Sequence, residues 1–82
     1  MVRAKLQPYR NRSGRSGVSA YAIGRDFILI EFGGGHVYRY DYAHTGRGHV
    51  EAMKQLARRG KGLATYVSTR SEVKKSYARK LG

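Results

Sequence analysis

Three segments in the first half of the chain show the apolar pattern of β-strands, with turn residues between them. The segments are VSAYAI (18–23), FILIEF (27–32) and HVYRYDY (36–42). Gly24, Arg25 and Asp26 separate the first two, and three consecutive glycines separate the second from the third. Short apolar segments joined by such turns are typical of consecutive hairpins. The pattern predicts a three-stranded antiparallel β-meander.

The spacing of apolar residues changes from strand-like to helical within GHVEAMKQLARR (48–59). The residues that recur at intervals of three or four are Val50, Met53, Leu56 and Ala57. Gly60 follows as a suitable C-cap, because glycine readily adopts a left-handed backbone. A small sheet needs a helix on one face to be stable. We expect this amphipathic helix to pack on the apolar face of the meander, in an α+β fold.

The segment LATYVST (63–69) fits two patterns. Leu63, Tyr66 and Val67 have helical spacing, whereas Leu63, Thr65 and Val67 alternate as in a strand. We favour a short helix, with the strand as the alternative.

The C-terminal residues predict a further helix. Thr69 and Glu72 have the spacing of a capping box. Val73, Tyr77 and Leu81 then form one apolar stripe, and lysines and arginines occupy the rest of the surface. We expect a basic, amphipathic C-terminal helix.

The length of the glycine turn decides which face of the sheet carries Tyr38 and Tyr40. If all three glycines form the loop, Ile30 pairs with Tyr38 and Ile28 with Tyr40, so both tyrosines lie on the core face. A loop of two or four residues would shift the pairing by one and place them on the other face. We favour core tyrosines with hydroxyls near the edge. Arg39 then lies on the opposite face, where Arg25 and Arg47 could join it.

The charge balance indicates a polyanionic partner. The chain has 17 lysines and arginines against 5 acidic residues, a formal net charge of +12, and a pI near 10.6. So much positive charge on 82 residues attracts nucleic acid through counterion release. Residues 1–17 are basic without an acid and end in NRSGRSG, so we expect a flexible basic arm followed by one domain over residues 18–82.

Several kinds of site find little support in the sequence. There is no cysteine, and the three histidines, His36, His44 and His49, do not have the spacing of a metal site with Asp41. We expect no metal and no cofactor. A small nuclease that uses these histidines is the weakest alternative, because no spacing supports it. No apolar run approaches the roughly 20 residues of a membrane helix, and the N-terminus lacks the pattern of a signal peptide. We expect a cytoplasmic monomer without a membrane partner.

The order of these motifs resembles the KTSC domain, a small domain found at the C-terminus of some lysyl-tRNA synthetases and in stand-alone bacterial and phage proteins. The likeness spans roughly residues 17–77. Its most specific marks are Tyr38-Arg39-Tyr40 and the later run of Gly62, Leu63, Tyr66 and Val67. The arm before Val18 and the loop YAHTGRGH (42–49) depart from the pattern. The resemblance implies RNA binding as a suggested function and no assigned catalytic residues.

Charge and resemblance together predict a non-catalytic module that binds nucleic acid, RNA rather than DNA. Phosphates would contact basic side chains and backbone N–H groups, and tyrosines could stack on bases. The candidate binding residues are Arg39, Arg47, Arg58, Arg59, Lys61, Gly62, Arg70, Lys74 and Lys75, with Tyr38 and Tyr40 for stacking. The alternative is a protein-interaction module that recognises an acidic partner.

Overall fold

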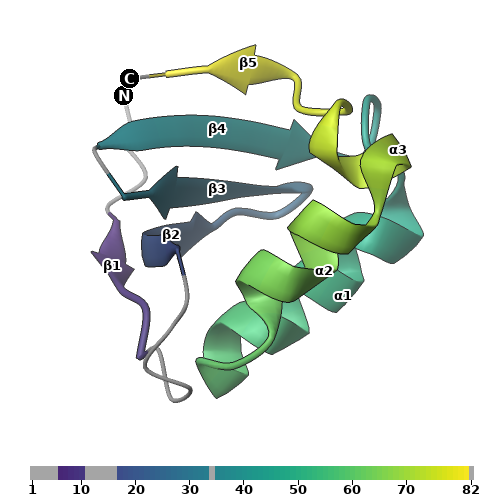
Figure 1. Cartoon of the computed structure of the whole chain (residues 1–82). Coiled ribbons are helices and arrows are strands. Elements are labelled where there is room, and N and C mark those ends of the chain that lie inside the picture. Colours follow the sequence, from purple (N-terminus) through teal and green to yellow (C-terminus); the bar gives the residue numbers. More distant parts are fainter. Residues whose placement is uncertain (1–5, 11–16, 34, 82) are drawn as a thin grey trace.

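The computed structural model describes residues 6–10, 17–33 and 35–81 as an α+β fold in which all the helices lie on one side of an antiparallel sheet (Figure 1). The order of the five strands in the sheet is β1-β2-β3-β4-β5. The strands are β1 (Gln7–Pro8), β2 (Val18–Ile23), β3 (Phe27–Phe32), β4 (His36–Asp41) and β5 (Arg79–Lys80). The helices are α1 (Arg47–Arg59), α2 (Leu63–Thr69) and α3 (Ser71–Lys74).

The core lies between the central strand β3 and the helices. Ile28 and Ile30 of β3 and Val50 and Met53 of α1 are completely buried. These α1 residues belong to the predicted apolar stripe. Gly60 ends the helix with φ 71°, and its N–H donates to the carbonyls of the last turn. Both the main helix and the short helix after Gly62 are confirmed.

Strands β3 and β4 pair in the register that we expected if all three glycines form the loop between them. Ile30 pairs with Tyr38 and Ile28 pairs with Tyr40. Gly35 has φ 83°, the left-handed conformation that such a turn requires. The two tyrosines therefore lie on the helix-covered face, where Tyr40 is 2% exposed and Tyr38 is partly buried.

The sheet has five strands rather than the three expected, and one of the extra strands comes from the expected arm. Gln7–Pro8 pairs with β2, and the next residue, Tyr9, belongs to the core. The Tyr9 hydroxyl accepts a hydrogen bond from the Leu63 N–H at 3.2 Å. These residues are thus part of the domain; the rest of the predicted arm lies outside the described residues, except Leu6, Arg10 and Gly17.

The prediction of a basic C-terminal helix is wrong. Residues Ser71–Lys74 form a single turn of helix, and the chain then returns to the sheet as β5, which pairs with β4. Only Val73 of the expected apolar stripe is buried. The Thr69 hydroxyl donates to the Thr65 carbonyl within α2 and caps nothing.

Candidate nucleic-acid interface

An apolar cleft opens between the helix-covered face of strands β3 and β4 and the last two helices. It encloses about 330 Å³. The side chains that line this aromatic cleft are Phe32, His36, Tyr38, Tyr40, Ala64, Val67, Ser68, Lys74 and Tyr77. Strands β3 and β4 supply its floor, α2 supplies one wall, and the segment between α3 and β5 supplies the other.

The rings of the cleft pack edge to face. The ring centroids of Phe32 and Tyr38 lie 5.8 Å apart, and those of Tyr38 and Tyr77 lie 4.8 Å apart. Tyr77 is 41% exposed and stands at the mouth. The three rings thus form one edge-to-face cluster with Tyr38 between Phe32 and Tyr77.

The hydroxyls of the cleft tyrosines have no partner within the described part of the chain. The tyrosine hydroxyls that form hydrogen bonds there belong to Tyr9, Tyr42 and Tyr66. No fully enclosed side-chain nitrogen or oxygen among the described residues lacks a partner, so the hydroxyl of Tyr40, which lines the cleft, is not fully enclosed. Burial, with the nearby phenols of Tyr38 and Tyr77, raises the pKa of Tyr40 to about 12. Its hydroxyl is therefore protonated at neutral pH and can donate.

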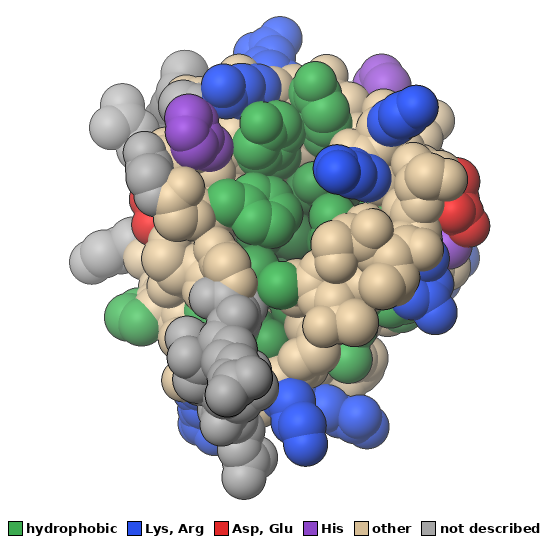
Figure 2. Space-filling view, viewed as in Figure 1, with side chains coloured by type: hydrophobic (Ala, Val, Ile, Leu, Met, Phe, Trp, Pro, Cys, Tyr) green, Lys and Arg blue, Asp and Glu red, His purple; other side chains and the backbone are tan. Residues whose placement is uncertain are grey.

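Basic side chains border the cleft. Figure 2 shows hydrophobic side chains gathered in a hollow, with Lys or Arg side chains and a histidine around it and acidic side chains only at the margins of this view. Lys74 lines the cleft, and the Lys80 Nζ lies 5.9 Å from the centroid of the Tyr38 ring. No acidic residue is among the described residues that line it. Neither lysine forms an ion pair with a described residue.

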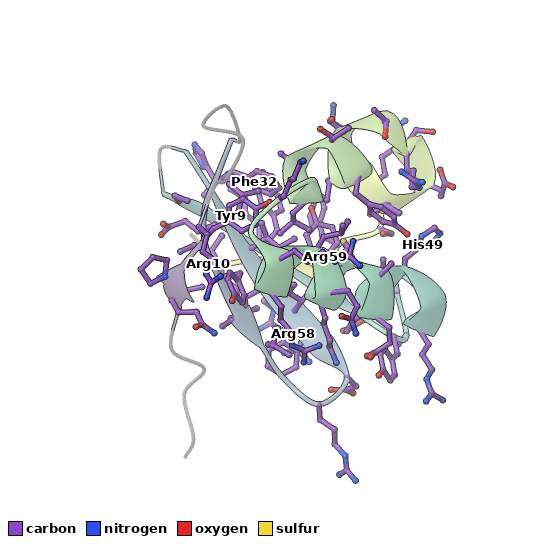
Figure 3. All side chains as sticks on the ribbon, turned by 90° about the horizontal axis from the view of Figure 1, so that it is seen from below. Tyr9, Arg10, Phe32, His49, Arg58 and Arg59 are labelled. Carbon is purple, nitrogen blue, oxygen red and sulfur yellow. The ribbon has the colours of Figure 1, made fainter. Side chains whose placement is uncertain are left out.

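The turn between α1 and α2 forms a second basic region, away from the cleft. Four of the predicted binding residues are exposed there, Arg58, Arg59, Lys61 and Gly62. Figure 3 shows Arg58 and Arg59 on the C-terminal part of α1, with Arg10 nearby and His49 toward the other end of the helix. A Cβ at Gly60 would collide with the Arg10 side chain, so the two residues are in direct contact.

Arg39 belongs to neither basic region. It lies on the helix-free face of the sheet, with its guanidinium 4.0 Å from the centroid of the Phe27 ring and its Nε 3.5 Å from an Asp41 carboxylate oxygen. Asp41 also accepts hydrogen bonds at 2.9 Å from the His44 N–H and at 2.8 Å from the His44 ring. Burial alone would raise the pKa of Asp41, but these bonds and the nearby positive charges outweigh it and lower the pKa.

The remaining predicted cations make contacts within the domain. The Arg70 guanidinium lies 4.0 Å from the centroid of the Tyr66 ring, and that of Arg47 lies 5.8 Å from the centroid of the Tyr42 ring. Lys75 is exposed beside Lys74. The nine predicted basic and glycine positions therefore form no single patch. Only Lys74 lines the cleft, with Lys75 next to it.

The expected stacking residues differ in accessibility. Tyr40 is too buried to present an outer face to a base and contributes to the floor of the cleft, whereas Tyr38 is partly accessible beside it. Sequence reasoning did not place Phe32, His36, Ser68 or Lys80 at the site. A weak signal for Lys80 was its position within the basic C-terminal residues, but only the return of the chain as β5 brings it next to Tyr38.

The histidines lie at separate places. His36 lines the cleft at the start of β4, His44 follows the end of that strand, and the His49 ring lies 2.7 Å from the Tyr66 hydroxyl. The described residues contain no group of three His, Cys, Asp or Glu side chains placed to hold a metal ion. His44 and Asp41 do pair, but the same carboxylate closes a turn and holds Arg39, which is a structural role.

Comparisons of this chain with protein-family models, with curated proteins and with solved structures found no match. No helix within the described ranges has both the length and the apolar character needed to cross a membrane.

Proposed function

We propose that this protein is a non-catalytic module that binds nucleic acid, RNA in preference to DNA, through the aromatic cleft and the lysines beside it. The observation that carries the proposal is the cleft itself: aromatic rings, tyrosine hydroxyls without a partner in the described chain, and a border of lysines with no acid in its lining. Aromatic faces bordered by cations are the usual elements of single-stranded nucleic acid recognition.

The distribution of charge supports a polyanion as the partner. The five acidic residues cannot offset 17 lysines and arginines. Asp41 is paired with Arg39 and Glu51 with Lys54, so these two carboxylates do not reduce the charge around the cleft. Lys74, Lys75 and Lys80 are exposed and form no ion pair with described residues. Such cations can replace the counterions of phosphates, which favours binding at low salt.

The preference for RNA over DNA rests on the resemblance to the KTSC domain. Both the preference and the resemblance are proposals. Tyr38 and Tyr40 of β4 and Val67 of α2 line the cleft, so residues that carry the resemblance also build the site. The suggested link of that family with RNA is an analogy. We also propose that the protein is a monomer and that it is located in the cytoplasm.

The experiment compares two variants of equal charge. One changes Lys74, Lys75 and Lys80 to glutamine next to the cleft; the other changes Arg58, Arg59 and Lys61 to glutamine at the α1–α2 turn. Labelled single-stranded RNA, duplex RNA, duplex DNA and an acidic protein are titrated with each variant at several salt concentrations. The slope of log affinity against log salt for single-stranded RNA should become shallower by about 0.7 for each phosphate that the variant no longer neutralises.

We expect the cleft variant to lose at least tenfold in RNA affinity and the turn variant to lose less. If both variants lost the same affinity for every anion, the positive charge would attract anions without specificity for a site. Absence of RNA binding, or displacement of RNA by stoichiometric acidic protein, would instead contradict the nucleic-acid function and favour the protein-interaction alternative.

A further inference from the structure

We propose that the aromatic cleft accepts one unpaired nucleobase, so that the protein selects single-stranded or looped RNA over fully paired RNA. This inference rests on the proposed function, because it assigns the substrate form that the same site would recognise.

The size of the cleft limits what can enter it. A volume of about 330 Å³ lies at the lower end of the range of small-molecule pockets. It suits one planar ring with part of its sugar, and it is far too narrow for a double helix. A paired base would have to leave its stack to enter, which costs free energy, whereas an unpaired base is already available.

The chemistry of the lining matches a base better than a purely apolar group. The walls are aromatic rings and the methyl-bearing side chains Ala64 and Val67. Tyr40 lines the cleft and is 2% exposed, and its hydroxyl has no hydrogen-bond partner among the described residues. Because no bond within the described residues uses this hydroxyl, it is free to donate to a ligand or accept from one. The edge of a base carries the donors and acceptors that would satisfy it, and an aliphatic ligand does not.

The cations at the mouth suit the phosphates on either side of an inserted base. Lys74 borders the α3 side, and Lys80 lies beside the Tyr38 ring on the β5 side. The phosphates on the two sides of a nucleotide in the cleft would therefore each have a lysine nearby. A second copy of this chain is a poor occupant, since each copy carries a formal charge of +12.

The test uses an RNA hairpin that carries 2-aminopurine at one loop position, the same hairpin with the probe in its stem, and a fully paired RNA of equal length. Two variants of α2 provide a matched pair. Ser68→Phe fills the cleft, because Ser68 lines it, whereas Thr65→Phe adds the same ring to an exposed position of the same helix that does not line it. Neither changes the charge, and circular dichroism and thermal melting verify that both fold.

We expect the wild-type protein and Thr65→Phe to bind the loop-bearing hairpin at least tenfold more tightly than the paired RNA. The probe fluorescence should change only when the probe is in the loop. Ser68→Phe should bind the loop-bearing hairpin and the paired RNA with nearly equal affinity, and the probe fluorescence should no longer change. Weaker, salt-dependent binding should persist. A mononucleotide at the same concentration should compete poorly, because it lacks neighbouring phosphates.

Different failures have different meanings. If the wild type and Ser68→Phe bind RNA equally well and without preference for the loop, the base-binding cleft is wrong, and of the proposed function only RNA binding by the lysines beside the cleft stands. If a mononucleotide displaces the RNA completely, the occupant is a free nucleotide and the inference about RNA form is overturned. If no RNA binds at all, both the inference and the proposed function fail.

Discussion

Two regions of the molecule combine tyrosine and lysine in opposite ways. At the corner between α1 and the end of β4, the Tyr42 hydroxyl donates to a Glu51 carboxylate oxygen at 2.6 Å. The Lys54 ammonium lies 2.8 Å from the same carboxylate and donates to the Arg25 carbonyl at 2.9 Å. In the aromatic cleft, the tyrosine hydroxyls and Lys74 have no such partner within the described residues.

Residue type alone therefore does not distinguish a stabilising contact from a binding contact. Lys54 is 4% exposed and is satisfied inside the domain, so its charge is neutralised locally. Lys74 is exposed and keeps its charge and its hydrogen-bonding capacity for an outside group. We expect changes at the corner to lower stability and changes at the cleft to lower binding. Two pairs of variants test this contrast, and a third measurement tests how the corner responds to acid.

The largest expected difference is between Lys54→Met and Lys74→Met. The first should lower the free energy of unfolding by about 1–3 kcal/mol, because it removes the bonds of the Lys54 ammonium to the Arg25 carbonyl and to Glu51 and leaves both with the Tyr42 hydroxyl alone. The second should change it by less than about 0.5 kcal/mol, as is usual at an exposed position. Urea unfolding provides the measurement, and RNA titration should give the reverse order of effects. Equal loss of stability in both variants would show that the contrast is wrong.

A smaller difference is expected between Tyr42→Phe and Tyr40→Phe. Tyr42→Phe removes the hydrogen bond to Glu51 and should lower the melting temperature. Tyr40→Phe removes a hydroxyl that has no partner among the described residues, so the melting temperature should hold or rise slightly. Thermal melts at neutral pH compare the two. A clear loss of stability in Tyr40→Phe would mean that its hydroxyl serves the folded protein itself.

The smallest effect concerns acid stability. Hydrogen bonds from Lys54 and Tyr42 lower the pKa of Glu51 below its usual 4.5. A carboxyl with a lowered pKa contributes stability above its unfolded pKa, and this contribution is lost as the pH falls through the folded pKa. Between pH 6 and pH 3, Glu51→Gln should therefore lose less stability than the wild type, as measured by urea midpoints. Parallel curves would exclude Glu51 as a contributor to acid sensitivity.

The elements with a strong local pattern could be predicted from the sequence. Val50, Met53 and Ala57 defined α1 because helical spacing over several turns has few competing explanations. The β3–β4 register was open between loop lengths in the sequence, and the observed register is the one of the three-residue loop, which places the tyrosines on the face of Ile28 and Ile30, as we favoured. The core position of Tyr40 followed from that register.

The elements that depend on distant contacts could not be predicted. Gln7–Pro8 and Arg79–Lys80 are strands of two residues, too short to have a periodicity, and they form only because the neighbouring strand is already in place. Tyr77 and Leu81 have helical spacing from Val73, yet the Ser76 carbonyl accepts a hydrogen bond from the Thr45 hydroxyl after the chain has left α3. Lys54 is not part of the apolar stripe of α1, and its burial depends on the Arg25 carbonyl from a distant turn.

The two short outer strands also affect how this protein meets other copies of itself. Pro8 in β1 has no N–H to offer a neighbour, and β5 presents Arg79 and Lys80, which are exposed and charged. Short edges with proline or like charges are a common protection against strand-to-strand aggregation. Each lateral border of the sheet thus ends in residues that discourage the addition of a strand from another copy.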